Sequence, residues 1–390
     1  MKERKSAILG AAFLMATSAI GPGFLTQTTV FTQKLLASFG FVILITILLD
    51  IAVQLNIWRI LTMSNLKAQD AANKVLPGLG YFLAAIIVLG GLAFNIGNLA
   101  GSGLGLQVLF GISPEAGAAI SCMVALIIFW MKEVGNTIDW FAKVLGILMI
   151  LLTGYVAVSS HPPLLAVVHR TFVPVTIDPL AIVTLVGGTV GGYISFAGAH
   201  RLLDAGVVGQ VNLHKVNRSA ISGIVITGLM RMVLFLGALG VVTAGVELAK
   251  GNPAASIFQA AAGSLGYRFF GVVIWSAAIT SVVGCAYTSI TFVAGFHSKL
   301  FENQRWIISA FILISAFIFI VVGNPVRLLV LAGTLNGITL PVALAIVLIV
   351  SRNRDIIGSY RHPLWLQVIG WVVVVVMGAM SLYSLVRAFA

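Results

Sequence analysis

Two charged residues in apolar surroundings are the first candidates for chemistry in this 390-residue chain. Asp50 and Arg231 each lie near the middle of a long apolar segment, where an ionisable group is costly to bury and is a functional candidate by default. Asp50 is a candidate to take up and release a proton, and Arg231 is a candidate counter-charge to a carboxylate or to Asp50. The alternative for each is a structural pair or the wall of a water-filled cavity.

A glycine-rich break interrupts the first apolar run, which extends from about residue 6 to residue 33. Glycine is a poor helix former and proline lacks the backbone N–H, so Gly21-Pro22-Gly23 predicts two half-helices. A half-helix begins with free N–H donors and about half a positive charge, which favours a carboxylate. Phe24, Thr26 and Gln27 follow the break. Thr26 and Gln27 either donate to a ligand or satisfy backbone groups freed by the break.

A second break is predicted inside the apolar run 180–200. It contains four glycines within six positions, and these are Gly187, Gly188, Gly191 and Gly192. Tyr193 and Ser195 follow directly and add neutral donors. Glycine also permits close helix packing, but two clusters at matching places in the chain favour a binding site between them.

Further polar residues lie in other apolar runs. Asn95 and Asn98 are three apart and share one helical face, which favours an interhelical hydrogen-bond network over contact with a ligand. Hydroxyl and amide side chains elsewhere either line a path or bond their own helix backbone; these are Thr280, Ser281, Thr288, Ser289, Thr291, Thr334 and Asn336.

The composition is that of an integral membrane protein. Hydrophobic residues make up 59% of the chain, charged residues 9%, and the mean hydropathy is +1.09. The net charge of +12 comes from basic residues scattered singly through short loops, so we expect no nucleic-acid partner. Cys122 and Cys285 are too far apart in the chain to suggest a metal site or a disulfide framework.

Hydropathy divides the chain into about eleven spans of the length a bilayer requires. These are 6–33, 40–58, 78–101, 115–131, 140–159, 180–200, 219–245, 267–292, 306–323, 326–349 and 364–386. Most basic residues then fall on the side of the N-terminus, which predicts an inner (plasma) membrane protein with its N-terminus in the cytoplasm and its C-terminus outside.

The two breaks are five spans apart, in the first and sixth spans. Five helices followed by five of opposite topology, each set led by a broken helix, are typical of an inverted-repeat transporter. We therefore predict one all-α membrane domain, with a first repeat over 1–160, a second repeat over 161–350 and one extra helix over 351–390.

Several segments resemble the NRAMP family of proton-coupled divalent metal transporters, which have a LeuT-type fold. Gly21-Pro22-Gly23-Phe24 is similar to the family's first-span Asp-Pro-Gly-Asn motif. The stretch 95–98, continuing through 109–112, resembles its third-span segment beginning Asp-x-x-Glu. The stretch 188–193 resembles its sixth-span segment carrying Met-Pro-His. The resemblance covers about the first ten spans.

The departures from that family concern the metal site. The motif's aspartate falls on Gly21, its asparagine on Phe24 and its methionine on Gly191, so no metal ligand of the motif remains. Transition metals favour a thioether, and divalent cations favour carboxylates.

The proton-handling residues of the family are replaced as well. Its third-span acids fall on Asn95 and Asn98, and amides do not titrate. Its two sixth-span histidines fall on Tyr193 and Gly198, and its tenth-span glutamine falls near Gly333.

These residues predict a secondary transporter for a small carboxylate-bearing solute, an amino acid or a compound like 5-oxoproline. Proton coupling, with Asp50 as the coupling residue, is part of this hypothesis. The resemblance adds that some divergent relatives are encoded beside oxoprolinase subunits. One alternative is a divalent cation transporter for Mg²⁺ or Mn²⁺ with a divergent site, and a second is a non-transporting sensor or a channel. No cofactor and no enzyme activity are expected, since HExxH, GxSxG and Walker A sequences are absent.

Overall fold

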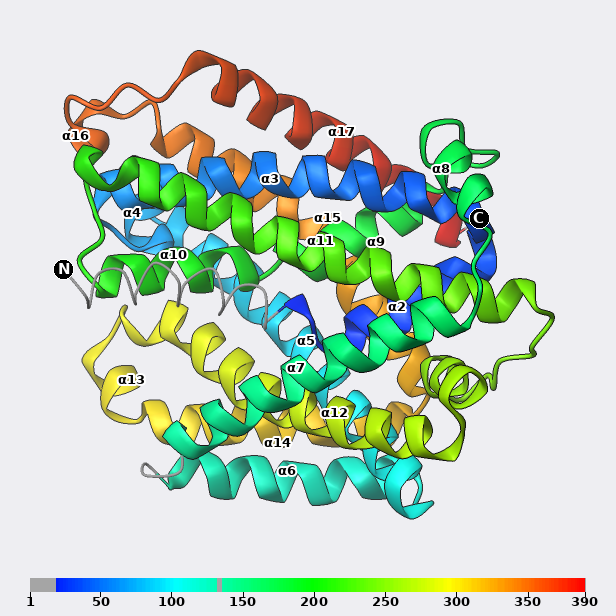
Figure 1. Cartoon of the computed structure of the whole chain (residues 1–390). Coiled ribbons are helices and arrows are strands. Elements are labelled where there is room, and N and C mark those ends of the chain that lie inside the picture. Colours follow the sequence, from blue (N-terminus) through cyan, green and yellow to red (C-terminus); the bar gives the residue numbers. More distant parts are fainter. Residues whose placement is uncertain (1–18, 132–134, 390) are drawn as a thin grey trace.

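The computed structural model describes residues 19–131 and 135–389, with the side chains of 132–145, 388 and 389 left aside. The described chain is built of helices, packed side by side with most of the long axes running in a similar direction (Figure 1).

The α-helices have the following bounds: α2 Pro22–Leu35, α3 Phe39–Ser64, α4 Ala68–Val75, α5 Leu79–Phe110, α6 Pro114–Trp130, α7 Gly135–Ser159, α8 Leu164–Phe172, α9 Pro179–Val190, α10 Ile194–Asp204, α11 Leu213–Thr243, α12 Pro253–Ala294, α13 Ser298–Glu302, α14 Gln304–Val322, α15 Pro325–Val350, α16 Arg354–Ile357 and α17 Leu364–Phe389. Two short 3₁₀-helices, η1 Leu36–Ser38 and η2 Gln210–Asn212, join neighbouring elements.

The apolar helices agree with a chain that crosses a membrane many times. Among the described residues, 8 helical segments are long and apolar enough to span a bilayer, or up to 9 if the bent pair of α7 and α8 is one span. The segment Pro22–Ser64 joins the second half of the first predicted span to the second, and α6 is a shorter apolar helix. The first half of the predicted span 6–33 lies outside the described residues.

Both predicted helix breaks are present. Ala19 is helical, Ile20 and Gly21 are not, and α2 begins at Pro22. Proline suits this first helical position because its missing N–H is not needed there. The second break separates α9 from α10 at residues 191–193, where Gly192 has a φ of +54°.

Glycine allows α9 and α15 to pack backbone against backbone. A Cβ atom at Gly187 would lie 2.0 Å from the carbonyl oxygen of Gly333, and one at Gly337 would lie 2.0 Å from that of Val183. No larger residue fits at this contact, so the two helices are held close beside the second break.

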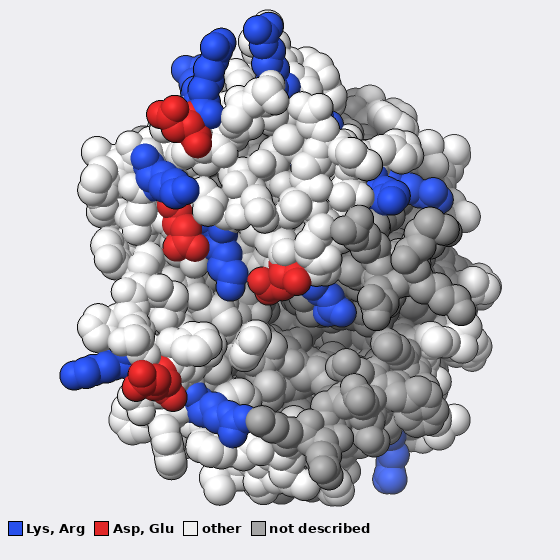
Figure 2. Space-filling model, turned by 90° about the vertical axis from the view of Figure 1, so that its left-hand side faces the viewer, with Lys and Arg blue, Asp and Glu red and all other residues white. Residues whose placement is uncertain are grey.

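Charged side chains gather at one end of the helix bundle. Figure 2 looks onto the end where α4, α10, α13 and α16 lie, and Lys and Arg side chains are spread over it with fewer acidic ones between them. The ion pair of Lys67 and Asp204, 4.0 Å apart, is part of this charged end.

Candidate functional site

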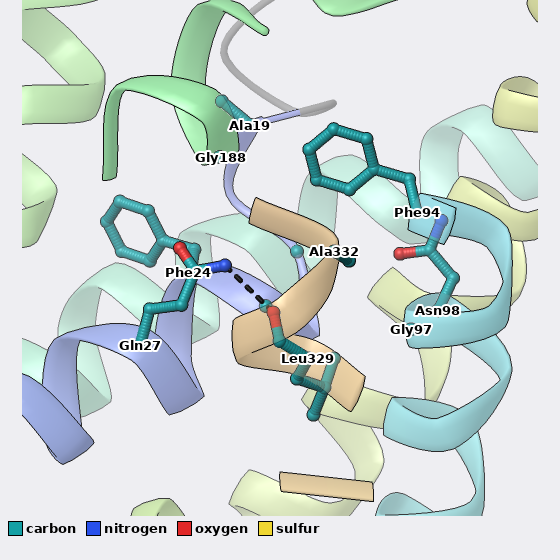
Figure 3. A pocket seen from close by; sticks show the side chains of 11 residues that line it. Ala19, Phe24, Gln27, Phe94, Gly97, Asn98, Gly188, Leu329 and Ala332 are labelled. Atoms are coloured by element: carbon teal, nitrogen blue, oxygen red, sulfur yellow. Dashed lines mark hydrogen bonds between the residues drawn. The ribbon is translucent and has the colours of Figure 1, made fainter. Parts of the chain in front are cut away.

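A cavity lies at the first helix break, beside the last turn of α9 that precedes the second break. Its lining comes from the first break, from α2 and α9, and from α5 and α15 (Figure 3). The lining residues are Ala19, Gly21, Gly23, Phe24, Gln27, Phe94, Gly97, Asn98, Gly188, Leu329 and Ala332. The empty space comes to ≈ 310 Å³, which includes open solvent, and only a small part of it can take the centre of a water molecule. Side chains must therefore move before a solute of several atoms can enter.

Gln27 supplies a free acceptor at this cavity. Its side-chain nitrogen donates to the carbonyl oxygen of Leu329 at 2.9 Å, as Figure 3 shows. Its Oε1 atom is buried without a hydrogen-bond partner. The amide also fills the space beside Gly333, where a Cβ would lie 2.5 Å from Gln27 Nε2. Gln27 thus lies against Gly333, the position near which the resemblance places a tenth-span glutamine.

The two asparagines of α5 have different surroundings. Asn98 lines the cavity, and its Oδ1 lies 3.8 Å from the Cβ position of Gly21. Asn95 is turned to α14, where its Nδ2 donates to Ser315 Oγ at 3.3 Å. Asn95 therefore makes an interhelical hydrogen bond, whereas Asn98 lines the cavity.

Arg231 lies behind the cavity rather than in its wall. It is 2% exposed, and its Nη1 donates to Thr189 Oγ1 at 3.0 Å. The guanidinium carbon lies 4.5 Å from the ring centroid of Phe24, a cation–π contact. Phe24 therefore touches Arg231 and also lines the cavity.

Asp50, from α3, lies near Arg231 and Thr189. It is 2% exposed, and its Oδ1 has no hydrogen-bond partner. The two buried residues therefore lie in one region of the bundle near Thr189, without an ion pair between them within 4.0 Å.

Several predicted site residues lie outside the lining of the cavity. Thr26 is buried but does not line it, and Pro22 packs against Gly101 of α5. Tyr193 packs edge to face against Phe94, with ring centroids 5.8 Å apart. The Ser195 carbonyl accepts a hydrogen bond from Trp58, and the Ser195 hydroxyl is buried without a partner.

Gly191 and Gly192 also lie away from the lining, because Asn336 of α15 fills the space beside them. A Cβ on Gly192 would lie 2.0 Å from Asn336 Oδ1, and one on Gly191 would lie 2.9 Å from the Asn336 carbonyl oxygen. The Asn336 amide donates to Gly90 at 3.0 Å and to Ala332 at 2.8 Å. The second break itself therefore does not line this cavity.

Sequence reasoning missed five lining residues. They are Ala19, Phe94, Gly97, Leu329 and Ala332, and apolar residues of this kind occur throughout the chain. Gly97 lies between the two asparagines in the chain, which was the available signal. Nothing in the sequence distinguished Leu329, whose backbone carbonyl does the bonding.

The chemistry of the lining is neutral. Glycine backbone, two amides and apolar groups line the cavity, and no acidic, histidine or sulfur side chain is among the lining residues. Within the described ranges, no group of three or more His, Cys, Asp or Glu side chains is placed to hold a metal ion. The site offers backbone N–H groups, amide donors and acceptors, and one buried guanidinium behind Phe24.

Comparisons with known proteins find membrane proteins similar to this chain in sequence. The chain is 56% identical over 380 residues to an uncharacterized membrane protein, YcsG, of Bacillus subtilis, covering 97% of this chain and 94% of that protein. It is 24% identical over 405 residues to the divalent metal cation transporter MntH of Klebsiella pneumoniae, covering 97% and 94%.

Solved structures give the fold. A variant of the Eremococcus coleocola manganese transporter superimposes with a TM-score of 0.76 at 16% identity, covering 97% of this chain and 86% of that one. MhsT in complex with L-phenylalanine superimposes with a TM-score of 0.64 at 14% identity, covering 96% and 98%. The predicted LeuT-type membrane fold is confirmed.

The model of the natural resistance-associated macrophage protein-like family, Nramp, matches residues 12–387. The match runs through both helix breaks and every lining residue of the cavity. The chain is a multi-span membrane protein that belongs to the Nramp family of transporters.

Proposed function

We propose that this protein is a secondary transporter of a small carboxylate-bearing solute, an amino acid or a 5-oxoproline-like compound, held between the two helix breaks. The observation that carries the proposal is the neutral lining of the cavity beside the N-terminus of α2. Gly21, Gly23 and Phe24 bring that helix end to the cavity. A helix N-terminus attracts an anion, and the lining residues that the structure describes include no acidic side chain to oppose one.

The free donors of α2 support the same solute class. Pro22 has no N–H, so the first backbone donors of the helix are those of Gly23 and Phe24, which both line the cavity. Gln27 and Asn98 add amide groups that can bond the polar remainder of an amino acid or lactam. The same fold occurs in a protein solved with L-phenylalanine, which is itself a carboxylate-bearing solute.

A divalent cation fits this lining less well. Manganese and magnesium are bound in proteins through carboxylate and other oxygen ligands, and Mg²⁺ normally keeps at least one carboxylate. The relatives named as metal cation transporters share 24% identity with this chain or less. At the cavity, the carbonyl and amide oxygens of this chain would be the only ligands among its lining residues.

Transport requires that the narrow cavity open to each side in turn. We propose that the charged end with α4, α10, α13 and α16 faces the cytoplasm of a cell whose inner membrane the protein spans, because basic loops favour that side. Proton coupling through Asp50 belongs to the same proposal.

Counterflow in proteoliposomes tests the proposal. Vesicles loaded with unlabelled compound are diluted into labelled 5-oxoproline, into labelled amino acids and into labelled 2-pyrrolidinone, which is 5-oxoproline without its carboxylate. We expect exchange of a carboxylate compound and none of 2-pyrrolidinone. Exchange of Mn²⁺ or Mg²⁺ without exchange of any carboxylate would refute the solute class.

A pair of glycine variants locates the site. Gly97 lines the cavity, and a Cβ there meets its nearest neighbours at 3.5 Å and 3.6 Å, which is ordinary contact. Gly97→Val fills the cavity and should lower counterflow about tenfold or more. One extra or missing methylene group in an apolar pocket changes substrate discrimination ~10- to 200-fold. Gly378→Val is the control, because nothing lies within 4 Å of a Cβ on α17 at that position. Equal counterflow by both variants would place the binding site elsewhere.

A further inference from the structure

Arg231 carries buried hydrogen-bond donors that nothing in the described structure uses. Its Nη1 donates to Thr189, whereas Nε and Nη2 have no partner although the side chain is 2% exposed. A buried donor without a partner destabilises the protein, and more so when it belongs to a charged group. A ligand that accepts from both atoms would recover this energy.

Asp50 does not satisfy these donors. The ion pairs with atoms within 4.0 Å in the described part of the chain are Lys34–Asp178 and Lys67–Asp204, so Asp50 and Arg231 are farther apart. Asp50 Oδ1 is itself without a hydrogen-bond partner. Asp50 thus leaves the Nε and Nη2 donors of the Arg231 guanidinium open.

Phe24 connects this open fork to the cavity. Its ring lies 4.5 Å from the guanidinium carbon, and the same residue lines the cavity. Phe24 is in the first turn of α2, three positions after Gly21. A change in the rotamer of Phe24 would widen a cavity that is too narrow in this conformation and would bring the guanidinium within reach of it.

We propose that Arg231 is the subsite for the carboxylate group of the transported solute, and that the Phe24 ring covers it in this conformation. The inference rests on the proposed function and names the charged group that the solute meets. A carboxylate accepts two parallel hydrogen bonds from one guanidinium, which matches the free Nε and Nη2 atoms. The adjacent N-terminus of α2 attracts the same charge.

Binding measurements on the purified protein form the first test. The probe is labelled 5-oxoproline, and the variants are Arg231→Gln, Arg231→Lys and the control Arg59→Gln. Arg59 lies on α3 and bonds Tyr360 at 3.1 Å, away from the cavity lining. We expect Arg231→Gln to weaken binding about 10- to 100-fold, the range for hydrogen bonds to a charged group. The affinity of Arg231→Lys should lie between those of the wild type and Arg231→Gln, because lysine keeps the positive charge but cannot donate two parallel hydrogen bonds.

Unchanged affinity in Arg231→Gln would overturn the subsite while leaving the proposed solute class in place. A wild-type protein that binds no carboxylate at all would refute the proposed function, and the second test then decides the subsite by itself.

Sodium formate is the probe for the second test, which needs no transport. Phe24→Ala removes the ring that covers Arg231. We therefore expect sodium formate to raise the melting temperature of this variant more than sodium chloride of equal concentration does. The double variant Phe24→Ala/Arg231→Gln should lose this difference. Phe24→Leu keeps most of the side-chain volume and serves if Phe24→Ala does not fold. Equal formate effects in the single and double variants, or no effect in either, would overturn the subsite.

Discussion

Gly192→Ala is the substitution at the second helix break whose effect the structure specifies best. Gly192 has a φ of +54°, and its Cβ would lie 2.0 Å from Asn336 Oδ1 and 2.9 Å from Asn336 Cγ. The left-handed conformation by itself costs a residue with a Cβ ~1–2 kcal/mol. The contact with Asn336 adds a second cost, because that side chain must leave its place.

Asn336 cannot move freely. Its Nδ2 donates to the carbonyl oxygens of Gly90 and Ala332, and its Oδ1 is buried without a partner. Losing two hydrogen bonds costs about 1 kcal/mol each. We therefore expect Gly192→Ala to reduce the free energy of unfolding by about 3–4 kcal/mol, the sum of the backbone and hydrogen-bond costs.

Gly206→Ala is the matched control. Gly206 has a φ of +66°, and nothing lies within 4 Å of its Cβ position. The free energy of unfolding of Gly206→Ala should fall only by the backbone cost of ~1–2 kcal/mol. Equilibrium unfolding in mixed micelles of increasing SDS content measures both variants. In an Asn336→Ala background the effect of Gly192→Ala should shrink to that of Gly206→Ala. Equal losses for the two glycine variants in the wild-type background would refute the reasoning.

Three further predictions concern charge and packing. Asp50→Asn should abolish the pH dependence of solute uptake in proteoliposomes, because an amide takes up no proton; a retained pH profile would remove Asp50 from the coupling mechanism. Burial, followed by the charge of Arg59, lowers the pKa of His362 to about 4. The unfolded chain binds this proton first as the pH falls, so the folded protein should lose stability between about pH 6.5 and 4. Melting temperatures across that range should fall less steeply for His362→Gln than for the wild type. Gly198→Ala places a Cβ 2.2 Å from Trp58, and overpacking of this kind should cost ~1–3 kcal/mol in the same micelle assay; wild-type stability would contradict the packing described.

Local rules of backbone chemistry made both helix breaks predictable. Proline at position 22 lacks an N–H, and four glycines lie within six positions from Gly187 to Gly192. Both features disfavour a continuous helix, so the sequence alone located both interruptions. Hydropathy likewise predicted a membrane protein built of long apolar helices. Burial in a bilayer requires each segment to satisfy its own backbone hydrogen bonds.

The lining of the cavity was only partly predictable. Gln27 and Asn98 were candidates from the sequence and do line it, whereas Thr26, Tyr193 and Ser195 were candidates and do not. All five are polar residues near a break or on a polar helix face. Which of them meets the cavity depends on the rotation of each helix about its axis, and packing against neighbouring helices sets that rotation.

The sequence by itself determined that this chain forms broken helices in a membrane and that its breaks lack carboxylate ligands. Only the tertiary structure brought Asp50 of α3 to Arg231 of α11, with Thr189 of α9 beside both. Only the tertiary structure placed Phe24 between that pair and the cavity. The physical reason is that helix formation depends on neighbours a few positions away in the chain, whereas these contacts join residues separated by many helices and depend on how whole helices pack.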